Sequence, residues 1–184
     1  MIVVRYCPKY SARIVEAISK TRKLQLGERD GIFDIEGLLK MIPSNHKIEY
    51  LKIFYNSPYP MNSSTIELIN KLNIKIIKIR IKLLEMFRAE EDAKYLLDNI
   101  PNLKRVTVNF YDRVGIVVNR DCTKLIVESM TETLRIFMNN PTFIPSHIVL
   151  GQLGKEEEAL LKCFPNATTE TIEDHLKTCE ICNR

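Results

Sequence analysis

Short segments of this chain alternate apolar and polar residues with the period of a β-strand. The clearest is residues 48–56, Ile-Glu-Tyr-Leu-Lys-Ile-Phe-Tyr-Asn, in which Leu51 and Ile53 are two positions apart. Side chains two positions apart on a strand point to the same face of the sheet. We therefore expect Leu51 and Ile53 to face a buried side, and Lys52 and Phe54 to face the opposite side.

The same apolar pair, at positions i and i+2, recurs along the chain. It is found at Leu24/Leu26, Leu51/Ile53, Ile77/Ile79, Val106/Val108 and Leu134/Ile136. The first members of these pairs are separated by 27, 26, 29 and 28 residues. A fixed period of this length is typical of repeat architectures in which each repeat is one small supersecondary unit. The spacing predicts units of one strand and one helix, with Lys52, Lys78 and Thr107 in one outward column.

A second pattern marks where helices end. Residues 38–44, 96–102 and 160–166 read Leu-Leu-Lys-Met-Ile-Pro-Ser, Leu-Leu-Asp-Asn-Ile-Pro-Asn and Leu-Leu-Lys-Cys-Phe-Pro-Asn. Proline cannot continue a helix and disfavours helix at the residue before it. We therefore predict helices over residues 34–42, capped by Asp34, 89–99 and 154–164. Apolar stripes with helical spacing predict two more, over residues 10–20 and after Ser64.

Residues 48–56 also match the spacing L-x-x-L-x-L-x-x-N, and here the chain resembles the leucine-rich-repeat families. The closing Asn recurs at Asn139, whereas Arg29, Lys82 and Tyr111 replace it elsewhere. The resemblance is to the long, helix-containing repeats of ribonuclease-inhibitor-like and F-box leucine-rich-repeat proteins. It implies an α/β fold: a short right-handed solenoid with a curved parallel sheet and helices on the convex side. The expected organisation is one domain, 1–184, with regular repeats over about 22–140 and a divergent unit over 141–184.

The pattern after residue 110 leaves two interpretations open. Residues 114–118 could form an extra strand paired with residues 106–110. A helix that starts at Asp121 could end near Met130 and leave residues 134–137 as the fifth strand. Alternatively it could run to Asn139, with the next strand at residues 147–150. Thr168 or Thr169 could cap a final helix.

The repeat resemblance implies that the inner strand face binds a partner. On this face the sequence combines basic residues with aromatic ones. Tyr, Phe and Arg are favoured at protein interfaces. The competing interpretation is an ordinary solvated surface. The predicted binding residues are Tyr50, Lys52, Phe54, Tyr55, Lys78, Arg80, Asn109 and Phe110. We expect a protein partner and no catalysis. F-box relatives recruit substrates to ubiquitin ligases, so the resemblance extends to a substrate-recognition adaptor, although no F-box segment is evident.

Composition narrows the function further. Apolar residues make up 45% of the chain and charged residues 27%, with a net charge of +4. This mildly basic balance permits a weak preference for acidic partners but does not indicate nucleic acid. Apolar runs are too short for a membrane span.

Five cysteines, an odd number without a dense disulfide framework, indicate a reducing, cytoplasmic compartment. No nucleophile elbow, phosphate-binding loop or metalloprotease motif occurs, so no catalytic residues, cofactor or membrane partner are predicted.

One metal-site candidate remains. His175, Cys179 and Cys182 form H-x-x-x-C-x-x-C, and imidazole and thiolate at this spacing can hold Zn²⁺. The motif resembles that of zinc-containing anti-sigma factors, and His147 or Cys163 could supply a fourth ligand. The simpler interpretation is that these cysteines are two free thiols near the end of the chain, without a metal. We favour the protein-binding module without a metal, and the alternative is a small zinc-binding regulatory protein.

Overall fold

The computed structural model of this chain describes residues 1–4, 12–27, 34–56, 61–82, 88–110, 113–151 and 153–178. The first half contains β1 (Ile2–Val4), α1 (Ala12–Lys20), β2 (Lys23–Leu26), α2 (Ile35–Lys40), β3 (Tyr50–Tyr55), α3 (Ser63–Lys71), β4 (Ile76–Lys82) and α4 (Ala89–Asn99). The second half contains β5 (Leu103–Asn109), β6 (Val114–Val118), β7 (Thr123–Val127), α5 (Glu132–Asn139), β8 (His147–Leu150), the 3₁₀ turn η1 (Gly154–Glu156), α6 (Glu157–Cys163), β9 (Thr168–Thr171) and α7 (Ile172–Thr178). The predicted α/β class is confirmed.

All the described strands join one sheet, and they lie in it in the order of the sequence, from β1 at one edge to β9 at the other. Strands β1 to β5 are parallel, and so are β7 to β9. Strand β6 runs antiparallel to both of its neighbours, β5 and β7. The sheet is therefore mostly parallel but mixed, and it is not closed. The prediction of a purely parallel sheet is wrong at β6.

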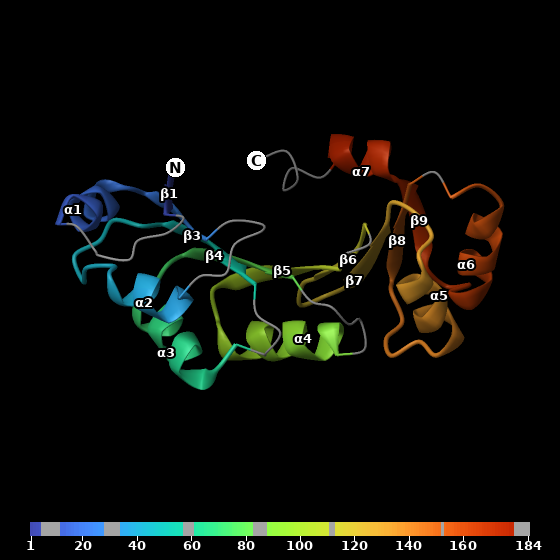
Figure 1. Ribbon diagram of the computed structural model, residues 1–184, viewed down its shortest axis with the longest axis horizontal. Coiled ribbons are helices and arrows are strands. Elements are labelled where there is room, and N and C mark those ends of the chain that lie inside the picture. The colour runs from blue at the N-terminus through green and yellow to red at the C-terminus, as the bar shows by residue number, and fades with distance from the viewer. Residues whose placement is uncertain are drawn as a thin grey trace.

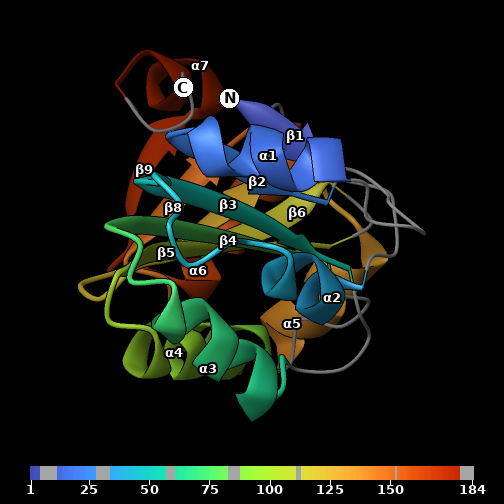
Figure 2. The ribbon, with the colours of Figure 1, turned by 90° about the vertical axis from the view of Figure 1, so that its left-hand side faces the viewer.

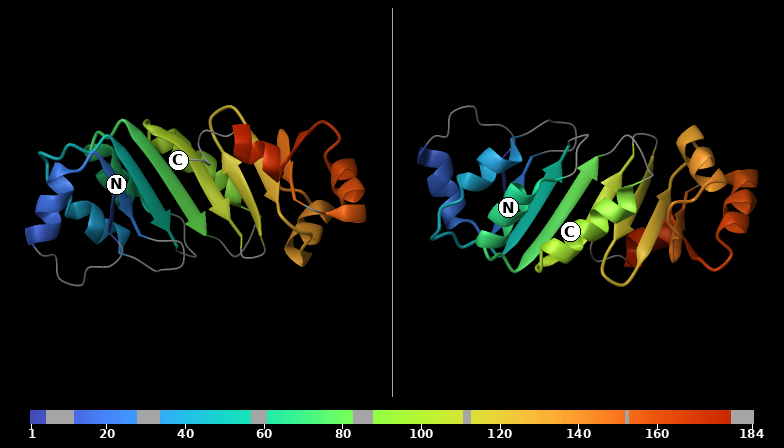
Figure 3. Two further views of the ribbon diagram at one scale, coloured as in Figure 1. Left: turned by 90° about the horizontal axis from the view of Figure 1, so that it is seen from above. Right: turned by 90° about the horizontal axis from the view of Figure 1, so that it is seen from below.

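Most of the helices lie against one face of the sheet. Figure 1 shows α2, α3 and α4 beneath strands β3 to β6, with α1 at the β1 edge and α5 and α6 at the β9 edge. The end-on view places α1 in front of β1 and β2 (Figure 2). Helix α7 lies on the opposite face, as the views from above and below agree (Figure 3). None of the described helices is both long enough and apolar enough to cross a lipid bilayer.

The core forms where the repeated apolar pairs face these helices. Leu24 pairs with Leu51, and Leu51 with Ile77, as the 27- and 26-residue steps predict. The next step differs: Ile77 lies opposite Leu103, and Ile79 lies opposite Val106. A β-bulge at Lys104 inserts one extra residue into β5 and shifts the register. As a result Arg105, and not the expected Thr107, stands beside Lys78.

Side-chain caps and prolines set the ends of the helices. Asp34 Oδ1 accepts a hydrogen bond from Gly37 N at 2.8 Å, which confirms the predicted cap of α2. Asn62 Oδ1 accepts one from Thr65 N, also at 2.8 Å, and starts α3. Helices α2, α4 and α6 each end two to three residues before a proline, as predicted. The predicted start of the first helix at Tyr10 lies outside the described residues, and α1 is described from Ala12.

In residues 121–139 the structure differs from both of the interpretations that the sequence left open. No helix begins at Asp121, because the backbone N–H groups of Asp121 and Cys122 both donate to Asn119 Oδ1 and close a turn. The turn leads into strand β7, which pairs antiparallel with β6. The predicted extra strand at residues 114–118 is confirmed as β6, and its partner is β5. The apolar pair Leu134/Ile136 lies in helix α5 and not in a strand.

The C-terminal unit agrees with the prediction in part. The strand at residues 147–150 and the helix ending near residue 164 are confirmed as β8 and α6. Thr168 and Thr169 do not cap a helix, because they belong to β9. The last helix starts after Thr171, whose Oγ1 accepts a hydrogen bond from Asp174 N at 3.1 Å.

Candidate binding surface on the open face of the sheet

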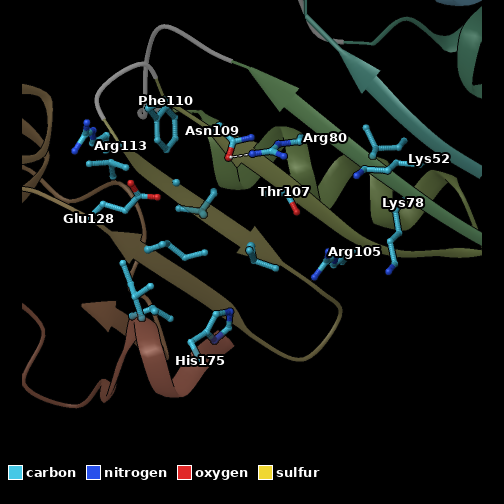
Figure 4. A pocket seen from close by; sticks show the side chains of 18 of the residues that line it. Lys52, Lys78, Arg80, Arg105, Thr107, Asn109, Phe110, Arg113, Glu128 and His175 are labelled. Carbon is cyan, nitrogen blue, oxygen red and sulfur yellow. Dashed lines mark hydrogen bonds between the residues drawn. The ribbon is translucent and has the colours of Figure 1, made fainter. Parts of the chain in front are cut away.

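The sheet face opposite α2, α3 and α4 carries a hollow of about 430 Å³, which we call the open-face pocket. Its lining comes from β3 to β8, from the turn between β5 and β6, and from α7. Figure 4 shows this pocket, with Lys52 and Lys78 at one end, Arg113 and Glu128 at another, and His175 below. Lys/Arg side chains from three adjacent strands therefore share one depression with apolar side chains from the strands beyond.

Four cations, Lys52, Lys78, Arg80 and Arg105, make up what we call the basic cluster. Register brings them together: Lys52 on β3 pairs with Lys78 on β4, and Lys78 pairs with Arg105 on β5. Arg80 Nη2 donates to Asn109 Oδ1 at 3.1 Å, which orients the guanidinium along β5 (Figure 4). Burial lowers the pKa of Lys52, and the charges of Arg80 and Arg105 lower it further. The cluster is thus a place where negative charge on a ligand would be stabilised.

Aromatic rings support these cations. The Lys52 Nζ atom lies 4.8 Å from the centre of the Phe54 ring, and Arg80 Cζ lies 5.7 Å from the same centre. The Lys78 Nζ atom lies 5.2 Å from the centre of the Tyr50 ring. Such cation–π contacts fix the position of a charged head group over a ring face. Burial raises the pKa of Tyr50, against the opposing charge of Arg105, so its hydroxyl stays protonated as a donor.

The other half of the pocket is mainly apolar, although Arg113, Glu128 and His175 also line it. Val117 on β6, Ile126 on β7 and Val149 on β8 line it, together with Ile172 of α7. Gly115 lies between Asn109 and Ile126 in the sheet. A Cβ atom at Gly115 would stand 2.9 Å from the carbonyl oxygen of Val108, so the glycine allows close backbone approach here. The pocket therefore has a basic end and an apolar end.

A polar cluster ties α7 to the sheet beside the apolar end. The Glu170 carboxylate on β9 contacts Lys124 Nζ at 3.2 Å and His175 Nδ1 at 2.8 Å through the same oxygen. The His175 side chain is only 8% exposed, although His175 belongs to a helix of seven residues. Burial raises the pKa of Glu170, but the hydrogen bonds from His175 and Lys124 outweigh it and hold the pKa below its usual value.

The Glu170→Gln variant should show what this cluster contributes. A carboxylate whose pKa is lowered on folding stabilises the folded state above its ordinary pKa of 4.5, and this contribution is lost as the pH falls below that value. We expect wild type to be more stable than Glu170→Gln near neutral pH and the difference to shrink below pH 4.5. Urea denaturation of both proteins, from neutral pH to below pH 4.5, measures this difference in the free energy of unfolding. Glu158→Gln, which removes an exposed carboxylate, is the control; a constant difference for Glu170→Gln at all pH values would contradict the expectation.

Six of the eight predicted binding residues line the pocket: Tyr50, Lys52, Lys78, Arg80, Asn109 and Phe110. Phe54 lies on the same strand face but is only 6% exposed, so it supports the cations from beneath. The placement of Tyr55 on the open face is wrong, because it pairs with Ile81 and packs against the core. The prediction missed Arg105, Arg113, His175 and the apolar end, although Arg105 has the same strand parity as Thr107.

The zinc candidate is only partly within the described residues. His175 is described, whereas Cys179 and Cys182 lie outside the described ranges. His147 Nδ1 is 2.9 Å from Ser146 Oγ, and Cys163 is exposed on α6. In the ranges that the structure describes, no group of three or more His, Cys, Asp or Glu side chains is placed to hold a metal ion.

No protein-family model, curated protein or solved structure matches this chain. A function therefore has to be inferred from its own residues and geometry.

Proposed function

We propose that this chain is a non-catalytic recognition module of the leucine-rich-repeat type, which binds another protein on the open face of its sheet. Three features support the solenoid interpretation. Strands follow the order of the sequence, strands β2, β3 and β4 pair at steps of 27 and 26 residues, and helices connect them along one face. The β6 insertion interrupts this series without ending it, since β7 to β9 continue in parallel.

The observation that carries the proposal is the open-face pocket itself. Predominantly parallel sheets normally have both faces covered by helices. Here α2, α3 and α4 cover one face, while the opposite face between β3 and β7 presents a hollow with cationic, aromatic and apolar walls. Arginine, tyrosine and phenylalanine are favoured at protein interfaces, where a few buried anchors supply most of the binding energy.

The adaptor role is the more specific form of the same proposal. The repeat resemblance extends to a protein that presents substrates to a larger assembly such as a ubiquitin ligase, and the five cysteines without a dense framework favour a cytoplasmic location. On this interpretation the open face selects the partner, and a separate surface or segment makes the connection to the assembly. The absence of sequence motifs for a nucleophile or a phosphate-binding loop supports a role without catalysis.

A double charge reversal tests the proposal. Protein partners captured with the whole chain are identified, and their affinity for wild type is compared with that for Lys78→Glu combined with Arg80→Glu. We expect at least about a tenfold loss, or roughly 1.4 kcal/mol, because both side chains line the pocket. Complementary charge also steers the encounter of two proteins, so part of the loss should appear in the association rate.

The matched control is Lys155→Glu combined with Lys162→Glu. It makes the same change in net charge at two exposed positions, one in η1 and one in α6, that do not line the open-face pocket. Circular dichroism and thermal unfolding should first establish that both double variants fold. Equal affinity of the pocket variant and wild type would contradict the proposal.

The zinc-binding regulator is the second candidate, and it rests on His175 preceding Cys179 and Cys182 at metal-ligand spacing. Metal analysis of the purified protein, with His175→Ala combined with Cys179→Ala as the comparison, separates the two. Stoichiometric zinc, together with partner binding lost in this variant but retained in Lys78→Glu/Arg80→Glu, would favour the regulator.

A further inference from the structure

The described lining of the open-face pocket has a strong charge imbalance. Five Lys and Arg side chains, Lys52, Lys78, Arg80, Arg105 and Arg113, line it, and Glu128 is the single carboxylate among the described lining residues. Four of the five belong to the basic cluster, on neighbouring strands β3, β4 and β5. The whole chain carries a net charge of only +4, so the positive charge is concentrated at this end of the pocket.

We infer that the open-face pocket receives an acidic peptide segment. This inference rests on the proposed function, in which the chain binds a protein on this face. Its Asp or Glu side chains contact the basic cluster, and an apolar side chain further along it contacts Val117, Ile126 and Val149. Paired Lys and Arg groups suit carboxylates, since the guanidinium of Arg can bind both oxygens at once. Burial lowers the pKa of Lys52, and a carboxylate placed beside it would favour its charged form.

The dimensions of the sheet set the length of this segment. Neighbouring strands lie about 4.8 Å apart, so the basic cluster spans about 10 Å and the distance from β3 to β8 is about 24 Å. An extended peptide rises about 3.4 Å per residue. About seven residues therefore cross the pocket from the basic end to the apolar end, with acidic residues in the first three or four positions and the apolar anchor in the last ones.

Nucleic acid fits the same surface less well. Binding of single strands combines a basic groove that follows the backbone with exposed aromatic rings on which bases stack. Here the basic cluster covers only three strands, and Phe54 is buried under Lys52 and Arg80. The rest of the described lining is largely apolar, with Arg113, Glu128 and His175 as its charged or polar exceptions, and the Phe110 ring there is only 5% exposed. A peptide with both acidic and apolar residues matches both ends, whereas a phosphate backbone matches one.

The test uses a fluorescently labelled heptapeptide with three acidic residues at one end and two leucines at the other. Fluorescence anisotropy compares it with three labelled probes: an amide version with Gln and Asn for the acids, a version with Ser for the leucines, and an oligouridylate. We expect the acidic peptide to bind at least about tenfold more tightly than the amide version and severalfold more tightly than the serine version. Its affinity should fall as salt is raised, and that of the amide version should not.

The protein variant for this test is Lys52→Gln combined with Arg105→Gln, which removes two charges of the basic cluster without reversing them. It should lower the affinity for the acidic peptide about tenfold and leave the amide version unchanged. If this variant does not fold, the salt dependence of the wild-type protein supplies the same information. The inference is overturned by equal binding of the acidic and amide peptides, by no binding up to about 1 mM peptide, or by tighter binding of oligouridylate.

The two proposals fail separately. If captured partners are lost in Lys78→Glu/Arg80→Glu but the acidic peptide has no advantage, the open face binds a protein by other chemistry and only the acidic-segment inference is wrong. If the acidic peptide binds as expected but captured partners are unaffected by the double reversal, the protein-recognition proposal is wrong for this face.

Discussion

Replacing Phe137 with alanine is expected to lower the free energy of unfolding by about 3–5 kcal/mol, the usual cost of truncating a buried aromatic ring. Phe137 is 0% exposed, and its ring centre lies 4.7 Å from that of Phe143 and 5.8 Å from that of Phe164. These contacts join α5 to the segments before β8 and after α6. The cavity left by the ring could not be filled without moving several of these segments. Urea denaturation at constant pH measures the change.

Ile136→Ala provides the control for this variant. Ile136 is the neighbouring residue on α5 and is 48% exposed, so its truncation should cost less than about 1 kcal/mol. Similar losses for the two variants would mean that α5 does not pack through Phe137. The pair of measurements also separates helix α5 from the predicted fifth strand, because that strand, with Leu134 and Ile136 facing the core, would bury Ile136 and turn Phe137 outward.

Leu51→Ala should cost about 2–5 kcal/mol, as other buried leucine truncations do. Leu51 is 0% exposed on β3, with Leu24 on one side and Ile77 on the other. It lies near the middle of the parallel half of the sheet, where neighbouring strands and helices restrict any collapse around a cavity. The denaturation midpoint should fall while the dependence of the free energy on denaturant stays constant.

Ile76→Ala serves as the comparison for Leu51. Ile76 begins β4 and is 39% exposed, so the same experiment should give a small change for it. A loss below about 0.5 kcal/mol for Leu51→Ala would show that Leu51 is not part of a tightly packed core.

The strands of the first half could be predicted because burial imposes a period of two on their side chains. Leu51 and Ile53 face the helices, whereas Lys52 faces the open side, and the sequence carries this alternation directly. Helix ends were predictable for a similar reason, since Asp34 caps α2 by a local hydrogen bond to Gly37. In both cases the determinants lie within a few residues of the structure they produce.

The features that were missed depend on neighbours that are distant in sequence. Leu125 and Val127 became strand residues because β6 offered them a partner, although Ile126 and Met130 also fit a helical stripe. Strand β9 is mostly exposed at the edge of the sheet, so its residues Thr168–Thr171 show no apolar alternation. The bulge at Lys104 leaves no mark in the sequence but shifts Arg105 into the place expected for Thr107.

The candidate site was predictable to the same extent as the sheet. Lys52, Lys78 and Arg80 follow from strand parity alone, and they form most of the basic cluster. The apolar end could not be foreseen, because Ile126 and Val149 reach it only through the true pairing of β7 with β8. The sequence indicates only a zinc-ligand role for His175, because its contact with Glu170 depends on α7 crossing to the open face.

The sequential order of the sheet has a consequence for how the chain could change in length. Each of the described strands bonds only to its predecessor and its successor, so none of them closes a long loop between distant parts of the chain. The reversals on either side of β6 cancel, and β7 again runs in the direction of β5. An inserted pair of strands therefore leaves every later unit in its original orientation. Whole strand–helix units, or hairpins that add two strands, could be gained or lost at one place while the pairing of the remaining strands is preserved.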